Sequence, residues 1–164
     1  GINAYLTLHI AQVLLRAGDA RCVALLDKVA DLASSTGQWP EAIHPRTLGG
    51  CMGDGQHVWA AAEWVMMIRN AFIREEGTRL VLAGGLAWRW LESGKRLAFG
   101  PAPTRFGTVR VIVGPIEKGQ TIPVQWEAHW RTRPDAIVVA PLGVNAAVAA
   151  AEDTRVSLQW RSTE

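Results

Sequence analysis

The first half of the chain shows the spacing of apolar residues that is typical of amphipathic helices. Apolar positions recur at steps of three and four over residues 3–17 and again over residues 22–33, so each segment has one apolar face. Gly18 and Asp19 separate these segments and are suited to end one helix and cap the next. The pattern therefore predicts a helical hairpin. A third helix is predicted over residues 57–74, where alanine and other apolar residues dominate.

From about residue 79 the pattern changes to the alternation of β-strands. Val109, Val111 and Val113 alternate with other residues, so we expect their side chains on one face of a sheet. The segments rich in β-branched and aromatic residues are 79–83, 96–99, 108–113, 121–130, 136–139 and 155–160. Residues 88–91 suit one helical turn or a bent connection, and the alanine-rich segment 146–151 is expected to be helical.

Helices followed by strands predict an α+β fold rather than alternating βαβ units. We expect residues 1–76 to form helical hairpins and residues 77–164 to form an antiparallel, β-sandwich-like domain.

Composition narrows the function classes. The formal net charge is only +2, and no block of Lys and Arg is present, which argues against a module that binds nucleic acid through phosphate contacts. No apolar run reaches the roughly 18 residues of a membrane-spanning helix. Tryptophan is abundant, with eight residues against one tyrosine and three phenylalanines. Such a bias indicates either extensive core packing or flat surfaces for stacking against ligands.

The segment from residue 36 to residue 57 is the part of the chain that is richest in chemically useful groups. Glu41 follows Trp39 and Pro40, and a carboxylate beside an apolar wall can be tuned for acid or base chemistry. A loop this long inside a compact domain is often functional. The other polar candidates for binding a ligand in this segment are His44, Arg46, Asp54 and His57. A purely structural role for the same residues, with Trp39 in the core, is the competing interpretation.

Residues of this segment could also take part in three other chemistries. His44, Cys51, Asp54 and His57 could converge on zinc, but their spacing matches no closed zinc site, so no metal is predicted. Cys51 could act as a nucleophile with His57 as its base, but no orienting partner is evident. The glycine-rich run 49–55 lacks the Lys-Ser/Thr of a phosphate-binding loop. No cofactor is predicted.

Two sequence segments of the chain are similar to motifs of a known group of enzymes. The first is Trp-Pro-Glu at 39–41, a glycine-rich stretch, and then Gly-x-His-x-Trp-Ala-Ala-Ala-x-Trp at 55–64. The second runs from residue 80 to residue 111, with a strand, a tryptophan-bearing turn and a Thr-x-x-Gly strand pair. Together they resemble the last hairpin and the following strands of six-hairpin (α/α)6-toroid glycosidases of the α-L-rhamnosidase-like and glucoamylase-like groups, over roughly residues 1–130.

The resemblance implies a role for particular residues. Glu41 stands where these families have the catalytic base of an inverting reaction, and Trp39, His57 and Trp59 stand near the sugar-binding rim. Ala42 departs from the glutamine that usually follows this glutamate in the glucoamylase-like group. The general acid of these families comes from an earlier hairpin, so Glu41 alone does not complete the two-carboxylate arrangement.

We therefore expect the C-terminal portion of a glycoside hydrolase, inactive or nearly so without the rest of the enzyme. Two alternatives remain: a non-catalytic carbohydrate-binding or assembly module that uses tryptophan surfaces, and a structural protein. The expected partners are a carbohydrate and a protein, which is either the remainder of a parent polypeptide or a second copy of this chain. Neither a nucleic acid nor a membrane is expected as a partner. The protein partner is expected because the first hairpin has apolar residues on more than one side, and large apolar patches are rare on monomers.

Overall fold

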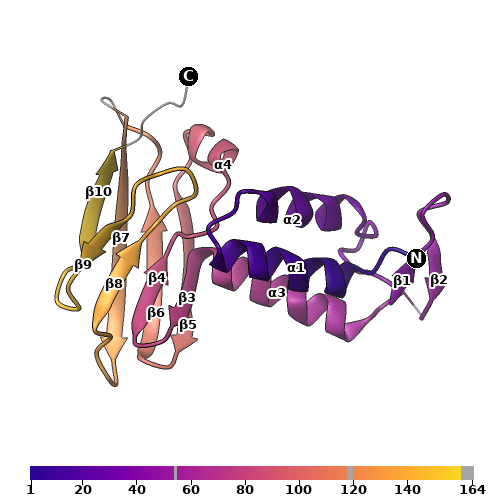
Figure 1. Ribbon diagram of the computed structural model, residues 1–164, viewed down its shortest axis with the longest axis horizontal. Coiled ribbons are helices and arrows are strands. Elements are labelled where there is room, and N and C mark those ends of the chain that lie inside the picture. The colour runs from indigo at the N-terminus through magenta and orange to yellow at the C-terminus, as the bar shows by residue number, and fades with distance from the viewer. Residues whose placement is uncertain (54, 118–119, 160–164) are drawn as a thin grey trace. The chain divides into compact units, whose positions relative to one another are not determined.

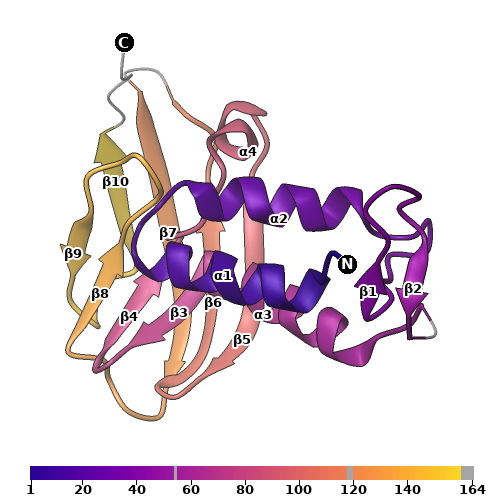
Figure 2. The same ribbon diagram turned by 45° about the vertical axis from the view of Figure 1, so that its right-hand side comes forward.

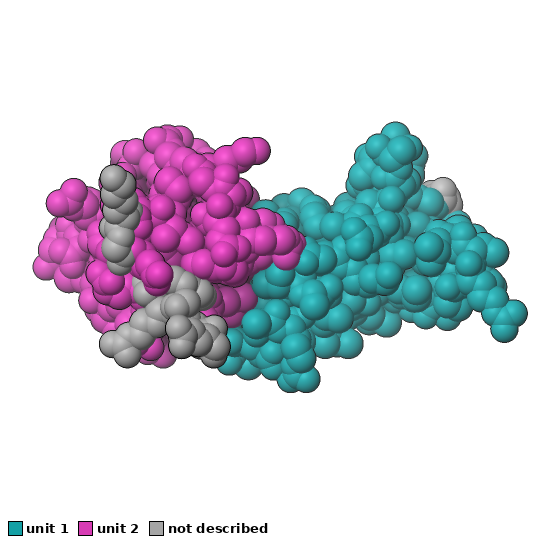
Figure 3. Space-filling model, turned by 90° about the horizontal axis from the view of Figure 1, so that it is seen from above, with its two compact units in different colours: residues 1–68 teal, residues 69–164 magenta. Residues whose placement is uncertain are grey.

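The computed structural model describes residues 1–53, 55–117 and 120–159. The chain divides into two compact units, residues 1–68 and residues 69–164, which Figure 3 shows in different colours. Helices lie in the first part of the chain and most strands in the second, so the predicted α+β class is confirmed. None of the described helices combines the length and the apolar character needed to cross a lipid bilayer.

Unit 1 is built on two complete helices, on most of a third, and on a short hairpin. Its elements are α1 (Ala4–Arg16), α2 (Arg21–Asp31), β1 (Ala42–Ile43), β2 (Gly50–Met52) and α3 (Val58–Phe72), which continues four residues beyond the unit. In both ribbon views α1 lies between α2 and α3 (Figure 1, Figure 2). The predicted hairpin of residues 3–33 is confirmed, and its core side carries Leu8, Leu15, Leu26 and Val29, all nearly or completely buried.

Unit 2 contains two four-stranded sheets. One has the strand order β10-β7-β6-β5 and is antiparallel throughout, and the other has the order β3-β4-β8-β9. The strands are β3 (Ile73–Glu76), β4 (Arg79–Leu82), β5 (Leu97–Thr104), β6 (Gly107–Val113), β7 (Thr121–Trp130), β8 (Ala136–Val139), β9 (Ala147–Ala149) and β10 (Arg155–Gln159). A short helix, α4 (Trp88–Glu92), forms where the sequence suited either one helical turn or a bent connection.

The apolar faces of these sheets form the core of unit 2 in a sandwich-like arrangement. Val109, Val111 and Val113 on β6 are fully buried, as the alternation predicted. The second sheet differs from the expectation of a purely antiparallel domain, because β4 and β8 pair in parallel. Strands β5, β6 and β7 lie between β4 and β8 in the sequence and belong to the other sheet, so the chain crosses between sheets before β8 returns beside β4.

Two segments adopt a different structure from the one expected. Residues 73–76 form a strand instead of the end of the third helix, and they pair with β4 over its whole length. Ile73 is β-branched, and two glutamates at a helix C-terminus would oppose the helix dipole, so both features favour the strand. The alanine-rich segment near residue 148 is strand β9, paired with β8, because sheet pairing outweighs the helix propensity of alanine.

A charged pair fixes the start of unit 2. Both guanidinium nitrogens of Arg69 donate to the Glu75 carboxylate, at 2.6 and 2.8 Å, and the backbone N–H of Arg105 also donates to it at 3.1 Å. The hydrogen bonds from Arg69 hold the pKa of Glu75 below its ordinary value, against the opposing effect of burial.

We expect Glu75→Gln to lower the free energy of unfolding of unit 2 by about 1–2 kcal/mol at pH 7, a range that allows for partial solvent screening of the pair. Because the folded-state pKa is lowered, this stabilisation is present above the ordinary glutamate pKa and is lost as the pH falls through the folded-state value. Urea denaturation at several pH values measures the difference, which should shrink below about pH 4. Glu92→Gln, at an exposed position, is the control. An equal loss at pH 7 and pH 3 would contradict the role given to this pair.

Candidate functional site

The N-terminal ends of α1 and α3 lie at the same end of unit 1. Tyr5 of α1 is stacked on Trp59 of α3, and further along the same helices His9 contacts Glu63. The later residue of α1 thus contacts the later residue of α3, which means that the two helices run side by side in the same direction. This arrangement places side chains from the first turns of both helices next to the loop that precedes α3.

An aromatic and polar group occupies this end of the helices. We call it the Trp59 cluster, and it consists of Tyr5, His9, His57, Trp59 and Glu63. The Tyr5 and Trp59 rings are stacked at 4.6 Å between centroids with an interplanar angle of 28°, and the His57 ring lies 5.1 Å from Tyr5. Trp59 remains 50% exposed. An indole that is supported on one side and open to solvent is suited to stack against the apolar face of a ligand.

Glu63 is the hydrogen-bond acceptor at the centre of this cluster. Its carboxylate accepts hydrogen bonds from Nε2 of Gln12 at 2.7 Å and from Nε1 of Trp59 at 3.4 Å, and it lies 3.0 Å from Nε2 of His9. The Glu63 side chain is only 19% exposed, so these contacts fix its position and, through the indole N–H, the orientation of Trp59. Within the same cluster, Nδ1 of His57 is buried without a hydrogen-bond partner among the described atoms, which is uncommon for a buried polar atom.

The Glu41 backbone is anchored at the same end of the helices. Its carbonyl oxygen accepts a hydrogen bond of 2.9 Å from Nδ2 of Asn3, the residue that precedes α1. Asn3 is only two residues from Tyr5, which packs on Trp59. In addition, the N–H of His57 donates to the carbonyl of Trp39 at 2.8 Å. The segment that carries Glu41 is therefore joined to the starts of both α1 and α3.

Gly53 makes this path of the loop possible. It adopts a positive φ of 79°, and a Cβ atom there would lie 3.1 Å from both the Cβ and the backbone nitrogen of Glu41. Few side chains tolerate such a conformation and contact. The half-buried Glu41 side chain thus lies against a position where a glycine is required.

The other predicted site residues have different surroundings. Trp39 is 3% exposed, its Nε1 donates to the carbonyl of Val29 at 2.8 Å, and its ring packs on Trp64, so it belongs to the core of unit 1. Nδ1 of His44 accepts the backbone N–H groups of Arg46 and Thr47 and so holds the turn between β1 and β2. The Arg46 side chain is exposed, and Asp54 lies outside the described residues.

The structure thus brings together His57 and Trp59 from the sequence-predicted set, with Glu41 held nearby by its backbone. Tyr5, His9 and Glu63 were not among the site residues predicted from the sequence. Tyr5 and His9 are four residues apart on one helix face, as are Trp59 and Glu63. The spacing was visible in the sequence, but the contact between the two helices was not.

Unit 2 has a separate groove of about 700 Å³ at the edge of β7. β10 pairs with β7 only from Thr121 to Gln125. The remainder of β7, residues 126–130, therefore lies beside the turn that precedes β10, and the groove is formed there. The groove is lined by Trp126, Glu127, Trp130, Arg133, Glu152 and Asp153, among others. Nε1 of Trp130 donates to the carbonyl of Ala151 at 3.0 Å, whereas Nε1 of Trp126 is buried without a partner among the described atoms.

Within the described part of the chain, no three His, Cys, Asp or Glu side chains are grouped closely enough to hold a metal ion. Comparisons with protein-family models, with curated proteins and with solved structures find no match to this chain. The chemistry of the site is therefore argued from its own geometry and from the motifs in the sequence.

Proposed function

We propose that this chain is the C-terminal portion of an inverting glycoside hydrolase, with Glu41 as the general base and the Trp59 cluster as a sugar-binding surface. The observation that carries the proposal is the half-exposed Trp59, which is stacked on Tyr5 and surrounded by hydrogen-bonding groups at the end of unit 1 where Glu41 is anchored. Flat aromatic surfaces beside carboxylates suit sugars, whose rings have both apolar faces and hydroxyl groups.

The proposed reaction needs two carboxyl groups on opposite sides of the glycosidic bond. Glu41 would take a proton from water as the water oxygen bonds to the anomeric carbon. The glycosidic C–O bond would break at the same time, and a general acid would protonate the departing oxygen. In the six-hairpin glycosidases that the chain resembles, the acid comes from an earlier hairpin, so the proposal assigns only the base to these 164 residues.

A second candidate function is supported by the groove in unit 2. Trp126 and Trp130 line it together with acidic residues and Arg133, a composition that would also suit a non-catalytic carbohydrate-binding module. In this case sugar would bind to the β-sheet unit, and Glu41 would have no chemical role.

Sugar binding by the 164-residue chain distinguishes the two candidates. We expect a panel of monosaccharides and aryl glycosides, titrated while protein NMR spectra are recorded, to include a ligand that perturbs residues of the Trp59 cluster. Trp59→Ala should then weaken its binding by about fivefold, because a stacking contact of this kind contributes on the order of 1 kcal/mol. Trp130→Ala is the matched control and should leave binding unchanged. Loss of binding in Trp130→Ala alone would favour the second candidate, and no binding across the panel would contradict both.

A further inference from the structure

The helices of unit 1 have a second apolar face that the described chain leaves uncovered. On α1, Leu8 and Leu15 point into the core, whereas Leu6, Ile10 and Val13 lie on the opposite side and are exposed. At 100° per residue, the spacing of the exposed set keeps it on one stripe along the helix. An amphipathic surface helix has one apolar stripe, so α1 is built like a helix that is covered on two sides.

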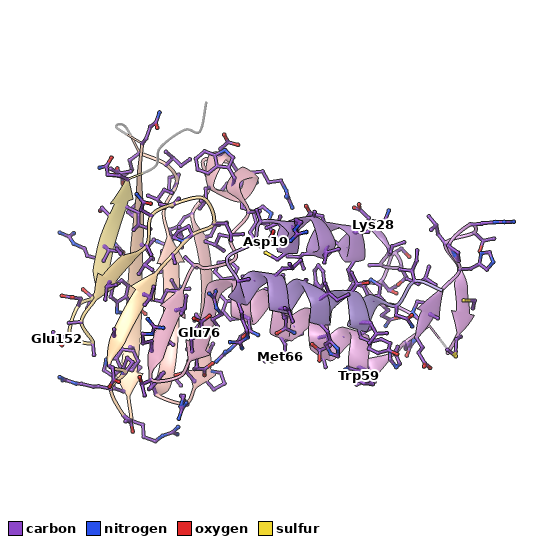
Figure 4. All side chains as sticks on the ribbon, in the orientation of Figure 1. Asp19, Lys28, Trp59, Met66, Glu76 and Glu152 are labelled. Atoms are coloured by element: carbon purple, nitrogen blue, oxygen red, sulfur yellow. The ribbon has the colours of Figure 1, made fainter. Side chains whose placement is uncertain are left out.

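The neighbouring helix α3 also carries exposed apolar residues. Val58, Val65 and Met66 of α3 are exposed, and they belong to the part of α3 that lies within unit 1. Met66 and Trp59 project from the same side of α3 in Figure 4. We call this surface the α1–α3 face, and it comprises Leu6, Ile10, Val13, Val58, Val65 and Met66, which are between 45% and 79% exposed.

We infer that the α1–α3 face is an interface at which two copies of this chain pair about a two-fold axis. The area supports this choice of occupant. At about 100 Å² for each exposed side chain, six residues present roughly 600 Å² on each copy, or about 1,200 Å² in total, which reaches the range of specific protein interfaces. A patch of roughly 600 Å² is at the upper end of what monomers expose, and patches of that size are often functional.

The charges of the two helices also suit pairing between identical surfaces. Residues 1–15 and residues 55–63 contain one formally charged side chain, Glu63, and its carboxylate is already occupied by Gln12, His9 and Trp59. A two-fold axis brings each surface against an identical one, so a charged face would meet like charges. The α1–α3 face avoids this repulsion, so the α1–α3 helix pair of one copy can pack as a layer against the same helix pair of the other copy. This inference goes beyond the proposed function and does not depend on it.

The test is the mass of the 164-residue chain in sedimentation experiments over a range of concentrations. We expect a dimer at micromolar concentration, and at least a hundredfold weaker association in both Val13→Asp and Val65→Asp. These valines are 69% and 62% exposed, so neither substitution disturbs the core of the monomer. The matched control is Val148→Asp, at a valine on β9 that is 72% exposed but lies outside the face. It should leave the dimer unchanged.

A monomer at 100 µM, a dimer that survives both substitutions, or masses that grow beyond the dimer would each overturn the inference. Circular dichroism establishes that the variants are folded. If one of them is not, hydrogen exchange of the wild-type chain provides an independent measurement. Protection of α1 and of residues 58–68 should then rise with protein concentration, while that of β9 should not. Concentration-independent protection of both helices would contradict the pairing.

Discussion

Glu41→Gln should lower kcat for glycoside hydrolysis by about a hundredfold or more in the intact enzyme that the proposed function requires, while KM changes little. The amide keeps the size of the side chain but cannot take a proton from the attacking water, and general-base catalysis typically contributes a factor of about 10² to 10⁴. The backbone anchor of residue 41 should persist, because Asn3 binds the carbonyl oxygen of Glu41 rather than its carboxylate. Steady-state kinetics with an aryl glycoside measures both constants.

Glu63→Gln is the control for this substitution, because it makes the same chemical change in the same unit. Glu63 accepts hydrogen bonds from Trp59 and Gln12 and lies 3.0 Å from Nε2 of His9, so it would position the proposed sugar-binding surface and should affect KM more than kcat. Azide should restore part of the activity of Glu41→Gln, because an anionic nucleophile needs no base. Wild-type kcat in Glu41→Gln, or an equal loss of kcat in both variants, would contradict the assignment of the base.

The sequence predicted those elements whose pattern is long and regular. The three- and four-residue spacing over residues 3–17 and 22–33 corresponds to α1 and α2, and the alternating valines correspond to the buried face of β6. The errors fall on short segments where pairing with a neighbouring strand decides the structure. Ile73–Glu76 and Ala147–Ala149 are strands because β4 and β8 are available to pair with them, and the residue composition of each short segment does not by itself show this pairing.

The candidate site was harder to predict because it depends on contacts between helices. Trp39 and Trp59 belong to the same motif and were given the same role, but the first is buried and the second is half exposed. The difference follows from their partners: Trp39 packs between Val29 of α2 and Trp64 of α3, whereas Trp59 stacks only against the side of α1 at Tyr5. No property of the tryptophans themselves distinguishes a core position from a surface one.

This difference leads to the second large effect, on the stability of unit 1. We expect Trp39→Ala to lower the free energy of unfolding of unit 1 by about 3–5 kcal/mol, the usual cost of removing a large buried aromatic side chain. The indole contacts Trp64 and donates its N–H to the carbonyl of Val29. The substitution therefore leaves a cavity and leaves this carbonyl with only its second hydrogen bond, from the N–H of Leu32. Trp39→Phe should cost less, because it restores most of the volume but not the hydrogen bond.

Trp59→Ala provides the comparison within the same motif. Trp59 is half exposed and makes one long hydrogen bond of 3.4 Å to Glu63, so we expect its removal to cost about 1 kcal/mol or less. Thermal and urea unfolding followed by far-ultraviolet circular dichroism near 222 nm, which reports mainly on the helices of unit 1, measures both variants. If the two substitutions were equally destabilising, Trp59 would be a structural residue like Trp39, and its assignment to a binding surface would have to be abandoned. If only Trp39→Ala causes a large loss of unfolding free energy, Trp59 is not required for stability, and its assignment to a binding surface stands.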